Sequence, residues 1–342
     1  MARTYREAGV DREEAERAVE RIARAAAATL TPAVLGGVGG FGGLFRFDTE
    51  SHVDPILVSS TDGVGTKLKV AVALGRHDTI GIDLVNACVN DVAVCGADPL
   101  FFLDYLAIGD LSADAVAEIV GGVAAGCAAA GIPLIGGETA QMPDLYRDGD
   151  YDLAGFAVGV VARADLIDGS AARAGDAVIG LPSSGLHTNG YSLARRVLPE
   201  STWGEPMPEG GSILGDVLLE PHRSYLDEVR ILRRALRDAG GDIHALAHIT
   251  GGGWEGNVPR TLPDGLGVEV DTGSWPVPAI FSLLQSRGDI ADEEMVRTFN
   301  LGIGMTAVVP AALADAAVAA LGDAYRIGRV VEVAEGMRVR FE

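Results

Sequence analysis

The alternation of apolar and polar positions divides the chain into a long series of short helices and strands. In the first half, helical spacing recurs over residues 11–28, 79–97 and 113–130, and short apolar runs at 56–60, 100–108, 133–135 and 154–162 predict strands. In the second half, the pattern predicts helices at 189–198 and 221–239 and strands at 176–181, 243–249, 302–309 and 326–333. Strands separated by helices favour an α/β architecture in both halves.

Two domains are expected from the length and from a break in the pattern. A chain of 342 residues with 48% hydrophobic side chains is longer than a single core usually grows. A polar connector containing Gly and Asp, at 165–175, resets the alternation. We therefore predict an N-terminal domain at 1–170 and a C-terminal domain at 171–342. Asp11 is predicted to cap the first helix, with Glu14 completing a capping box.

The charge changes this picture, because the formal net charge is −21. Nucleic acid and anionic membranes would be repelled, so we expect neither as a partner, and an anionic substrate needs a local positive site. Lys67 and Lys69 are the only lysines. An acidic, lysine-poor surface suggests adaptation to high salt, with an arginine-biased genome as the alternative. The charged start of the chain and the lack of a run of eighteen uncharged apolar residues indicate a cytoplasmic protein.

The three cysteines predict neither a disulfide nor a zinc site. Cys88 and Cys95 lie seven residues apart in a predicted helix, about 10 Å at helical rise, which is too far for a disulfide. Cys127 is distant in sequence, and no CxxC pair occurs. Reduced cysteines that fill the core are the expectation.

The most informative segment is 61–67, which follows a predicted buried strand. Ligand sites in α/β folds lie at such strand ends. Asp62 is therefore a candidate Mg²⁺ ligand, Gly63 and Thr66 are expected close to the nucleotide, and Lys67 offers a compact charge to phosphate. The alternative is a simple turn that exposes a lysine.

A glycine cluster at 36–43 matches GxGxxG, but its context is not that of a dinucleotide fold. A helix precedes it and a β-like segment at 44–47 follows, whereas the fingerprint needs the reverse order. A loop that covers phosphates remains open as an interpretation, as does a hinge. The candidate nucleotide contacts in the loop are Gly39, Gly40, Phe41 and Gly42.

Two further segments add oxygen ligands. Asp83, Asn86, Asn90 and Asp91 fall within one arc of an otherwise apolar helix, which favours a role facing a metal ion and nucleotide over the alternative of a solvated face. At 136–143, Gly137, Glu138 and Thr139 follow another strand. Glu138 is predicted to join Asp62 and Asp91 in a Mg²⁺ site that ATP phosphates bridge.

The second half offers two polar loops. The loop at 183–192 carries Ser184, His187 and Asn189, a set that suits a phosphorylated substrate, and His187 is a candidate for proton transfer. The segment at 250–257 is expected to form an amide nest for phosphate, with Gly252 and Asn257. A hydrogen-bonded loop histidine and a plain glycine-rich turn are the alternatives. The remaining histidines are expected to be structural, namely His52, His77, His222, His244 and His248.

Taken together, several motifs closely resemble the aminoimidazole ribonucleotide synthetase family, the phosphoribosylformylglycinamidine cyclo-ligases. These motifs are STDGVGTK, GIDLVNACVNDVAVCGADPLFFLDY, GGETAQMP, SSGLHTNGYS and ITGGGWEGNVPR. The resemblance runs from residues 5–11 to 299–305, so it covers nearly the whole chain. Gln141 stands where the family usually has Glu, and the stretch at 25–30 replaces the family's basic residues, leaving Arg24 as the nearest cation.

The resemblance implies an enzyme that closes the imidazole ring of formylglycinamidine ribonucleotide with ATP in purine biosynthesis. It implies a homodimer whose N-terminal domains form a shared β-barrel near the ATP, and a C-terminal mixed sheet with helices that contacts the substrate. Asp62, Asp91 and Glu138 would hold Mg²⁺ and phosphate, with Lys67 beside them, and His187 and Asn189 would face the substrate. The rival interpretations are a kinase similar to thiamine monophosphate kinase or selenide kinase, and a nucleotide-binding subunit without catalysis.

Overall fold

The chain folds into two compact units, each with a sheet of its own. The computed structural model describes residues 12–37, 40–208, 210–334 and 336–342, so Asp11 of the predicted capping box lies outside the described residues. Unit 1 comprises the described residues up to Val92 together with 97–163, and unit 2 comprises 93–96 and 164–342. The polar connector at 165–175 therefore belongs to unit 2.

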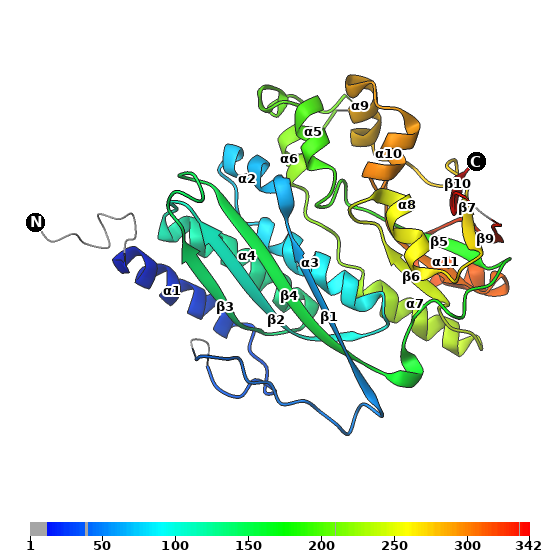
Figure 1. Ribbon diagram of the computed structural model, residues 1–342, viewed down its shortest axis with the longest axis horizontal. Helices are drawn as coiled ribbons and strands as arrows, with labels where there is room; N and C mark the ends of the chain where they lie inside the picture. Colours follow the sequence, from blue (N-terminus) through cyan, green and yellow to red (C-terminus); the bar gives the residue numbers. More distant parts are fainter. Residues whose placement is uncertain (1–11, 38–39, 209, 335) are drawn as a thin grey trace, which may run out of the picture. The chain divides into compact units, whose positions relative to one another are not determined.

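Unit 1 is built on a four-stranded mixed sheet (Figure 1). Its strands stand in the order β1-β4-β2-β3 and are β1 (Pro55–Gly63), β2 (Asp98–Ile108), β3 (Leu134–Gln141) and β4 (Tyr151–Ala162). β4 runs antiparallel to both β1 and β2, and β3 runs parallel to β2. Strands β1, β2 and β3 therefore point in one direction, and their C-terminal ends lie at the same end of the sheet.

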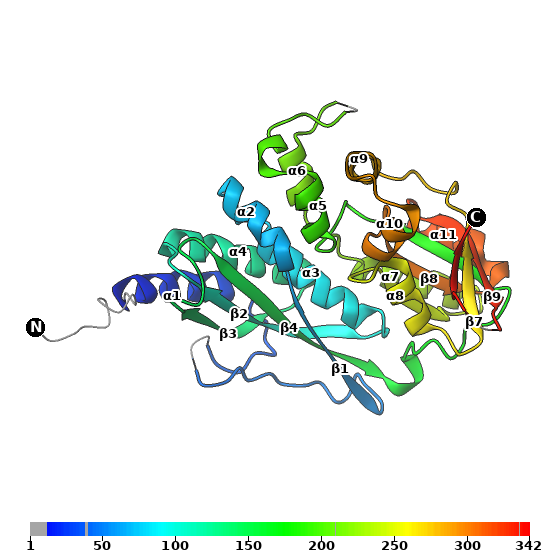
Figure 2. The same cartoon turned by 45° about the horizontal axis from the view of Figure 1, so that its top comes forward.

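Helices cover one face of this sheet. The helices of unit 1 are α1 (Arg12–Ala27), α2 (Leu68–Leu74), α3 (Ile80–Ala93) and α4 (Ala113–Ala130), with α1 and α4 side by side (Figures 1 and 2). Helix α3 packs so closely on β4 that a Cβ atom on Gly159 would lie 2.4 Å from the Val92 side chain. On the opposite face, Leu57 and Phe156 remain 66% and 42% exposed. The described part of the chain thus leaves apolar side chains on this face exposed.

Helix α4 has the bounds that the sequence pattern predicts, and both of its ends have physical causes. The Ser112 Oγ accepts a hydrogen bond from the Ala115 N–H at 3.2 Å, and Gly131 ends the helix with φ of 71°, which glycine adopts most readily. Its length and composition would also suit a membrane span, but half of it is buried inside the protein. We interpret α4 as a core helix of unit 1.

Unit 2 contains a six-stranded sheet in the order β10-β7-β9-β5-β8-β6. The strands are β5 (Ala177–Pro182), β6 (Ala245–His248), β7 (Leu266–Val270), β8 (Ile303–Val309), β9 (Tyr325–Glu332) and β10 (Val339–Phe341). All pairs are antiparallel except β10 with β7. The helices are α5 (Tyr191–Val197), α6 (Leu214–Leu219), α7 (Leu226–Asp238), α8 (Gly253–Asn257), α9 (Ala279–Gly288), α10 (Asp292–Thr298) and α11 (Ala314–Leu321).

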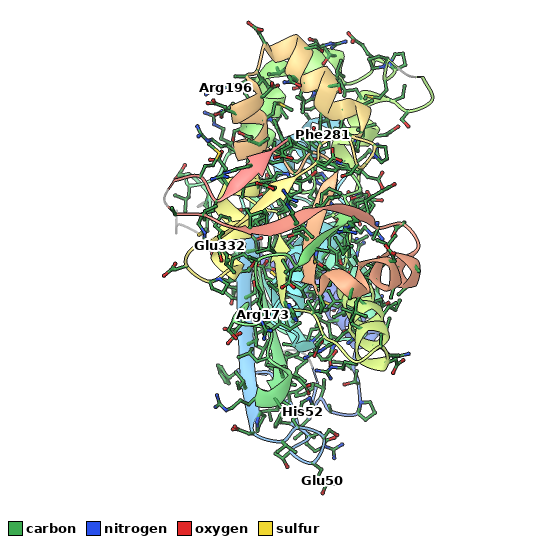
Figure 3. All side chains as sticks on the ribbon, turned by 90° about the vertical axis from the view of Figure 1, so that its right-hand side faces the viewer. Glu50, His52, Arg173, Arg196, Phe281 and Glu332 are labelled. Atoms are coloured by element: carbon green, nitrogen blue, oxygen red, sulfur yellow. The ribbon has the colours of Figure 1, made fainter. Side chains whose placement is uncertain are left out.

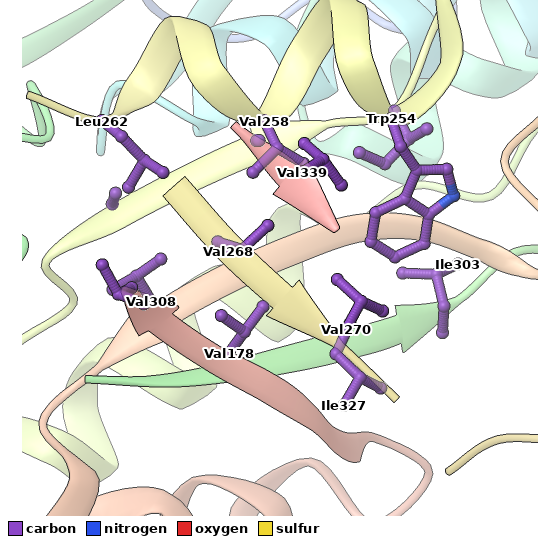
Figure 4. Packing of buried hydrophobic residues seen from close by; sticks show 14 of the residues in the cluster. Val178, Trp254, Val258, Leu262, Val268, Val270, Ile303, Val308, Ile327 and Val339 are labelled. Carbon is purple, nitrogen blue, oxygen red and sulfur yellow. The ribbon is translucent and has the colours of Figure 1, made fainter. Parts of the chain in front are cut away.

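Trp254 lies in the core of unit 2, among aliphatic side chains of the sheet such as Val270 and Ile303 (Figure 4). Its Nε1 donates a hydrogen bond to the Asn300 carbonyl oxygen at 3.1 Å, so its polar atom is satisfied. Helices α5 and α9 pack together at one end of unit 2, where Figure 3 labels Arg196 and Phe281. This packing holds α5, which follows the loop that begins at residue 183.

Several predicted elements have different ends. Helix α3 ends at Ala93 rather than at residue 97, so Cys95 lies beyond the helix. Strands β1 and β3 continue to Gly63 and Gln141, because hydrogen bonding to β4 and β2 outweighs the weak strand propensity of Gly, Asp and Glu. All three cysteines are free, as predicted. The pattern missed β7, β10 and several short helices.

Candidate active site

The segment at 61–67 forms the end of β1 and the turn after it. Residues 61–63 still belong to the strand, and a 3₁₀ helix at Gly65–Lys67 leads directly into α2. Gly65 has φ of 68°, a conformation that side chains disfavour, which explains a glycine there. The Gly63 N–H donates to the Asp62 Oδ1 at 2.8 Å. Asp62 therefore stands at the C-terminal end of its strand, as predicted.

Lys67 does not project into solvent. Both Lys67 and Asp83 have side chains that are 0% exposed, and the lysine Nζ lies 2.9 Å from each oxygen of the carboxylate. The interpretation as an exposed turn lysine is therefore wrong. The charge of Lys67 is paired with Asp83 inside unit 1, and its role beside phosphate stays a prediction. The pair ties the segment after Asp62 to α3.

The polar stripe of α3 is buried rather than solvated. Asp83, Asn86 and Asn90 are 0%, 8% and 0% exposed. Buried groups of this kind are stable only when they are hydrogen-bonded or bound to an ion, so the alternative of a solvated face is wrong for these three. Asp91, at the end of the stripe, is partly buried and accepts a hydrogen bond from the Ser60 Oγ at 3.1 Å.

Asp62 and Asp91 are near neighbours of the same buried group, the thiol of Cys88. Burial raises the pKa of Cys88 well above its usual value, and the negative charges of Asp62 and Asp91 raise it further. Ser60 and Asp62 lie on the same face of β1, two residues apart, and Ser60 contacts Asp91. The structure thus brings two of the three predicted metal-binding carboxylates together.

Glu138 stands apart from this pair. Asp62 of β1 pairs with Gly155 of β4, which pairs on its other side with Asp104 of β2. Asp104 in turn pairs with Gly137 of β3. Three strand spacings therefore separate Asp62 from Gly137, about 14 Å along the sheet. Side chains alternate along a strand, so Glu138 also projects from the face opposite to that of Asp62. A single chain does not bring Glu138 to the same ion as Asp62 and Asp91.

Glu138 instead lines a cavity of about 610 Å³ at the β3 edge of unit 1. Residues from two predicted nucleotide-binding segments line this cavity together, namely Gly40, Phe41, Gly42, Gly137, Glu138 and Thr139. Gly39 lies outside the described residues. An apolar stripe of α1, the ring of Phe156 and residues of β2 and β3 also line the cavity. An apolar pocket with a few polar groups is the usual form of a small-molecule site.

Asp104 is a buried carboxyl group in this cavity that the motif analysis missed. It is 7% exposed, and burial raises its pKa to about 7. A Cβ atom on Gly137 would lie 1.9 Å from its Oδ1, so the glycine at 137 makes space for this carboxyl. A lone Asp within the apolar stretch at 100–108 was the available signal.

In unit 2, the two predicted substrate loops lie next to each other. A Cβ atom on Gly251 would lie 3.4 Å from the Asn189 Oδ1. The Ser184 N–H donates to the His187 Nε2 at 3.2 Å, and the Ser184 Oγ donates to the Pro221 carbonyl oxygen. These bonds fix the shape of the loop around His187.

Two predicted substrate contacts hold the loops in shape. Asn257 is 3% exposed, and its amide donates to the carbonyl oxygens of Gly253, Thr250 and Gly251. It therefore closes the glycine turn, and its contact with substrate stays a prediction. Gly252 has φ of 89°, which accounts for glycine at the start of α8.

His187 is almost completely buried, with 1% exposure, and it forms a cluster with His222 and His248, which were expected to be structural. Its ring stacks on that of His222 with centroids 4.0 Å apart. His222 in turn places its Nε2 2.9 Å from the Nε2 of His248. Sequence spacing gave no signal for this cluster, because the three residues come from separate elements.

Comparison with known proteins shows the family to which the chain belongs. The family "AIR synthase related protein, N-terminal domain" matches residues 44–161, and its C-terminal counterpart matches residues 173–339. The chain belongs to the AIR synthase related family. The two matches include Asp62, Asp91 and Glu138 in unit 1 and His187 in unit 2, whereas the loop at 40–42 precedes the matched N-terminal region.

Among curated relatives, this family member is 53% identical to a protein of Desulfitobacterium hafniense over 309 residues, 90% of each chain. It is also 53% identical to one of Anaeromyxobacter sp. over 345 residues, 98% of each chain. Both are named phosphoribosylformylglycinamidine cyclo-ligase. Solved structures share the fold at lower identity. E. coli HypE, a hydrogenase maturation protein, aligns at 20% identity with a TM-score of 0.68, covering 96% of this chain and 93% of its own.

A thiamine-monophosphate kinase from Stenotrophomonas maltophilia aligns at 21% identity with a TM-score of 0.63, covering 95% and 96% of the two chains. Likeness at this identity shows the fold alone. The kinase alternative therefore rests on fold similarity, whereas the cyclo-ligase interpretation rests on relatives at 53% identity along nearly the whole chain.

Proposed function

We propose that this protein is an ATP-dependent phosphoribosylformylglycinamidine cyclo-ligase of purine biosynthesis. The observation that supports this most strongly is the 53% identity to proteins of that name over 90% or more of both chains. In the proposed reaction, ATP phosphorylates the formyl oxygen of formylglycinamidine ribonucleotide, because that oxygen is otherwise a poor leaving group. The ribose-bearing nitrogen then attacks the formyl carbon, and phosphate departs as the imidazole closes.

Unit 1 is proposed to bind ATP. The cavity beside β3 offers an apolar lining from α1 and Phe156 for a base, and glycines that allow phosphates to approach the backbone. Glu138 lines the same cavity. Lys67 is proposed as a positioning residue, since its pairing with Asp83 holds the end of β1 against α3.

Asp62 and Asp91 are proposed to hold Mg²⁺. The fit is supported by their shared position around Cys88 and by the hydroxyl of Ser60, because Mg²⁺ prefers oxygen ligands. A bound Mg²⁺ would neutralise charge on the phosphates. Within the chain itself, α3 and β1 orient the two carboxylates, and the amides of Asn86 and Asn90 are buried in α3.

A homodimer is proposed to complete the ATP site. The cavity with Glu138 lies at the β3 edge of the sheet, and Asp62 lies on β1 at the other edge. A barrel that sets β1 of one protomer beside β3 of its partner would bring the two edges together. The exposed side chains of Leu57 and Phe156, on the face of the sheet opposite the helices, would then be buried inside the barrel.

Unit 2 is proposed to bind the substrate through the loop at 183–192, with Ser184 and Asn189 as contacts. His187 is proposed to move a proton during ring closure. We also propose that the enzyme works in a cytoplasm of high salt, because its surface is acidic and it has only two lysines.

The reaction is tested by measuring two products from one incubation. Purified protein with ATP, Mg²⁺ and formylglycinamidine ribonucleotide should yield ADP and a diazotisable aminoimidazole in equal amounts. ADP without the aminoimidazole would refute the cyclo-ligase and support a kinase. Asp62→Asn should abolish turnover and leave the fold intact, whereas wild-type rates in that variant would remove Asp62 from the metal site.

The shared site is tested by mixing two inactive variants. Asp62→Asn and Glu138→Gln protomers, differently tagged and reassembled, should recover about half of the wild-type activity per mixed dimer, because one of its two sites is then wholly wild type. If each site used residues of one chain only, every site in the mixed dimer would carry one substitution. No recovery would refute the crossed arrangement.

A further inference from the structure

Three histidines from separate parts of unit 2 meet in its interior. His187 lies in the loop after β5, His222 precedes α7, and His248 is the last residue of β6. They are 1%, 1% and 5% exposed. One nitrogen atom from each ring lies within 4.8 Å of those of the other two.

The spacing of these nitrogens is close to that of metal ligands. The Nε2 atoms of His222 and His248 are 2.9 Å apart. In a tetrahedral zinc site with Zn–N bonds of about 2.0–2.1 Å, two ligand nitrogens stand about 3.3 Å apart. Small ring movements would therefore allow both atoms to bind one ion. The alternative is a hydrogen bond between two neutral imidazoles, in which one ring donates and the other accepts.

The protein holds this cluster in place at a conformational cost. His187 has φ of 60°, a left-handed conformation that non-glycine residues rarely adopt. Gly304 of β8 makes the space, because a Cβ atom there would lie 2.4 Å from the His187 Cε1 and 2.1 Å from the Tyr225 Oη. Tyr225 is itself fixed by donating to the Pro182 carbonyl oxygen at 2.8 Å.

We propose that His187, His222 and His248 bind one late first-row transition metal ion, such as Zn²⁺ or Co²⁺. Imidazole nitrogen suits these ions, whereas Mg²⁺ requires oxygen ligands, so this site is separate from that of Asp62 and Asp91. A bound ion occupies a nitrogen of His187 and restrains its ring. If His187 moves a proton as in the proposed function, filling the site inhibits turnover.

Metal binding is measured on the full-length protein without substrate, so its outcome does not depend on the proposed reaction. After treatment with a chelator, Co²⁺ should bind with one equivalent per chain, produce the visible absorption of a tetrahedral site, and be displaced by Zn²⁺. His222→Gln and His248→Gln should each weaken binding by more than about 100-fold, since even loss of a partner outside the ligand shell costs 10–100-fold.

His52→Gln is the matched control, because His52 projects from the loop before β1 in unit 1 (Figure 3). It should bind Co²⁺ like the wild type. Equal binding by His222→Gln and wild type would overturn the proposal, as would wild-type protein that binds no Co²⁺.

X-ray absorption of the Zn²⁺-loaded wild-type protein keeps the test decisive if the variants fail to fold. Three imidazole ligands are expected, and two or fewer would overturn the site. Inhibition is tested separately, by adding one equivalent of Zn²⁺ to the turnover assay. If Zn²⁺ binds through three imidazoles but turnover continues unchanged, the metal site stands and the proposed role of His187 in proton transfer is refuted.

Discussion

The buried pair of Lys67 and Asp83 allows a sharp test of whether a residue is structural or chemical. Both side chains are 0% exposed, and the Nζ lies 2.9 Å from each carboxylate oxygen. Lys67→Met should leave the Asp83 charge buried without its main partner, which costs about 3–5 kcal/mol. Lys67→Met combined with Asp83→Leu removes both charges, and such replacements range from neutral to stabilising by about 1–4 kcal/mol.

The assay must report on unit 1. The three tryptophans, Trp203, Trp254 and Trp275, all lie in unit 2, so their fluorescence would report on unit 2. Cys88 and Cys127 are buried in unit 1 and become reactive to thiol reagents when it unfolds. With a urea dependence of roughly 2 kcal/mol per molar, a loss of about 4 kcal/mol lowers the labelling midpoint by about 2 M.

Two results would refute this reasoning. A single variant that loses less than about 1 kcal/mol would mean that the buried charge is satisfied in another way. A double variant as unstable as the single one would mean that the pair itself stabilises unit 1. The double variant also tests chemistry: a positioning role predicts substantial turnover once the fold is kept, whereas a loss beyond about 100-fold in a folded protein would restore Lys67 to direct contact with phosphate.

Three further predictions concern other parts of the chain. Gly304→Ala should destabilise unit 2 by about 1–3 kcal/mol, because the new methyl group would overlap the His187 ring, whereas Gly204→Ala, with open space around its Cβ, should have little effect on tryptophan-monitored unfolding. Asp104 has a pKa raised to about 7 by burial, so the folded state binds its proton more tightly than the unfolded state. Stability should therefore fall as pH rises from about 4 to 7 and level off above that, and Asp104→Asn should flatten this slope in urea titrations at several pH values. Finally, thermal stability should rise between low and molar salt, because screening relieves the repulsion of a net charge of −21, and an unchanged midpoint would refute salt adaptation.

Local signals predicted α4 better than they predicted the strands at the site. Helix α4 has an apolar stripe, a serine cap and a terminal glycine, so its ends are encoded nearby. Helix α3 ends at Ala93, although Val94 and Ala97 continue the apolar pattern, and the left-handed Gly96 was the one local sign of a turn. Tertiary hydrogen bonding, rather than propensity, decides such ends.

The histidine cluster shows a different limit of sequence reasoning. The sequence predicts a role for His187 because it lies in a polar loop, whereas the residues around His222 and His248 predict only structural histidines. The α-helices α5, α6 and α7 lie between His187 and His248, and no periodicity links residues so far apart. The contact arises because β5 and β6 both pair with β8, which brings the ends of these strands together.

Strand order likewise explains why the sequence predicts correctly that Asp62 and Glu138 lie at the same end of the sheet, but not that they lie far apart along it. β1, β2 and β3 run in one direction, so a rule about strand ends correctly sets Asp62 and the residue before Glu138 on one row. That rule contains no information on strand order. The order β1-β4-β2-β3 puts two strands between them, because the later strand β4 inserts beside β1. If one half of the ATP site lies at each edge of this sheet, as proposed, the chain has a physical reason to pair with a copy of itself. The mixed-variant experiment then tests that pairing together with the reaction.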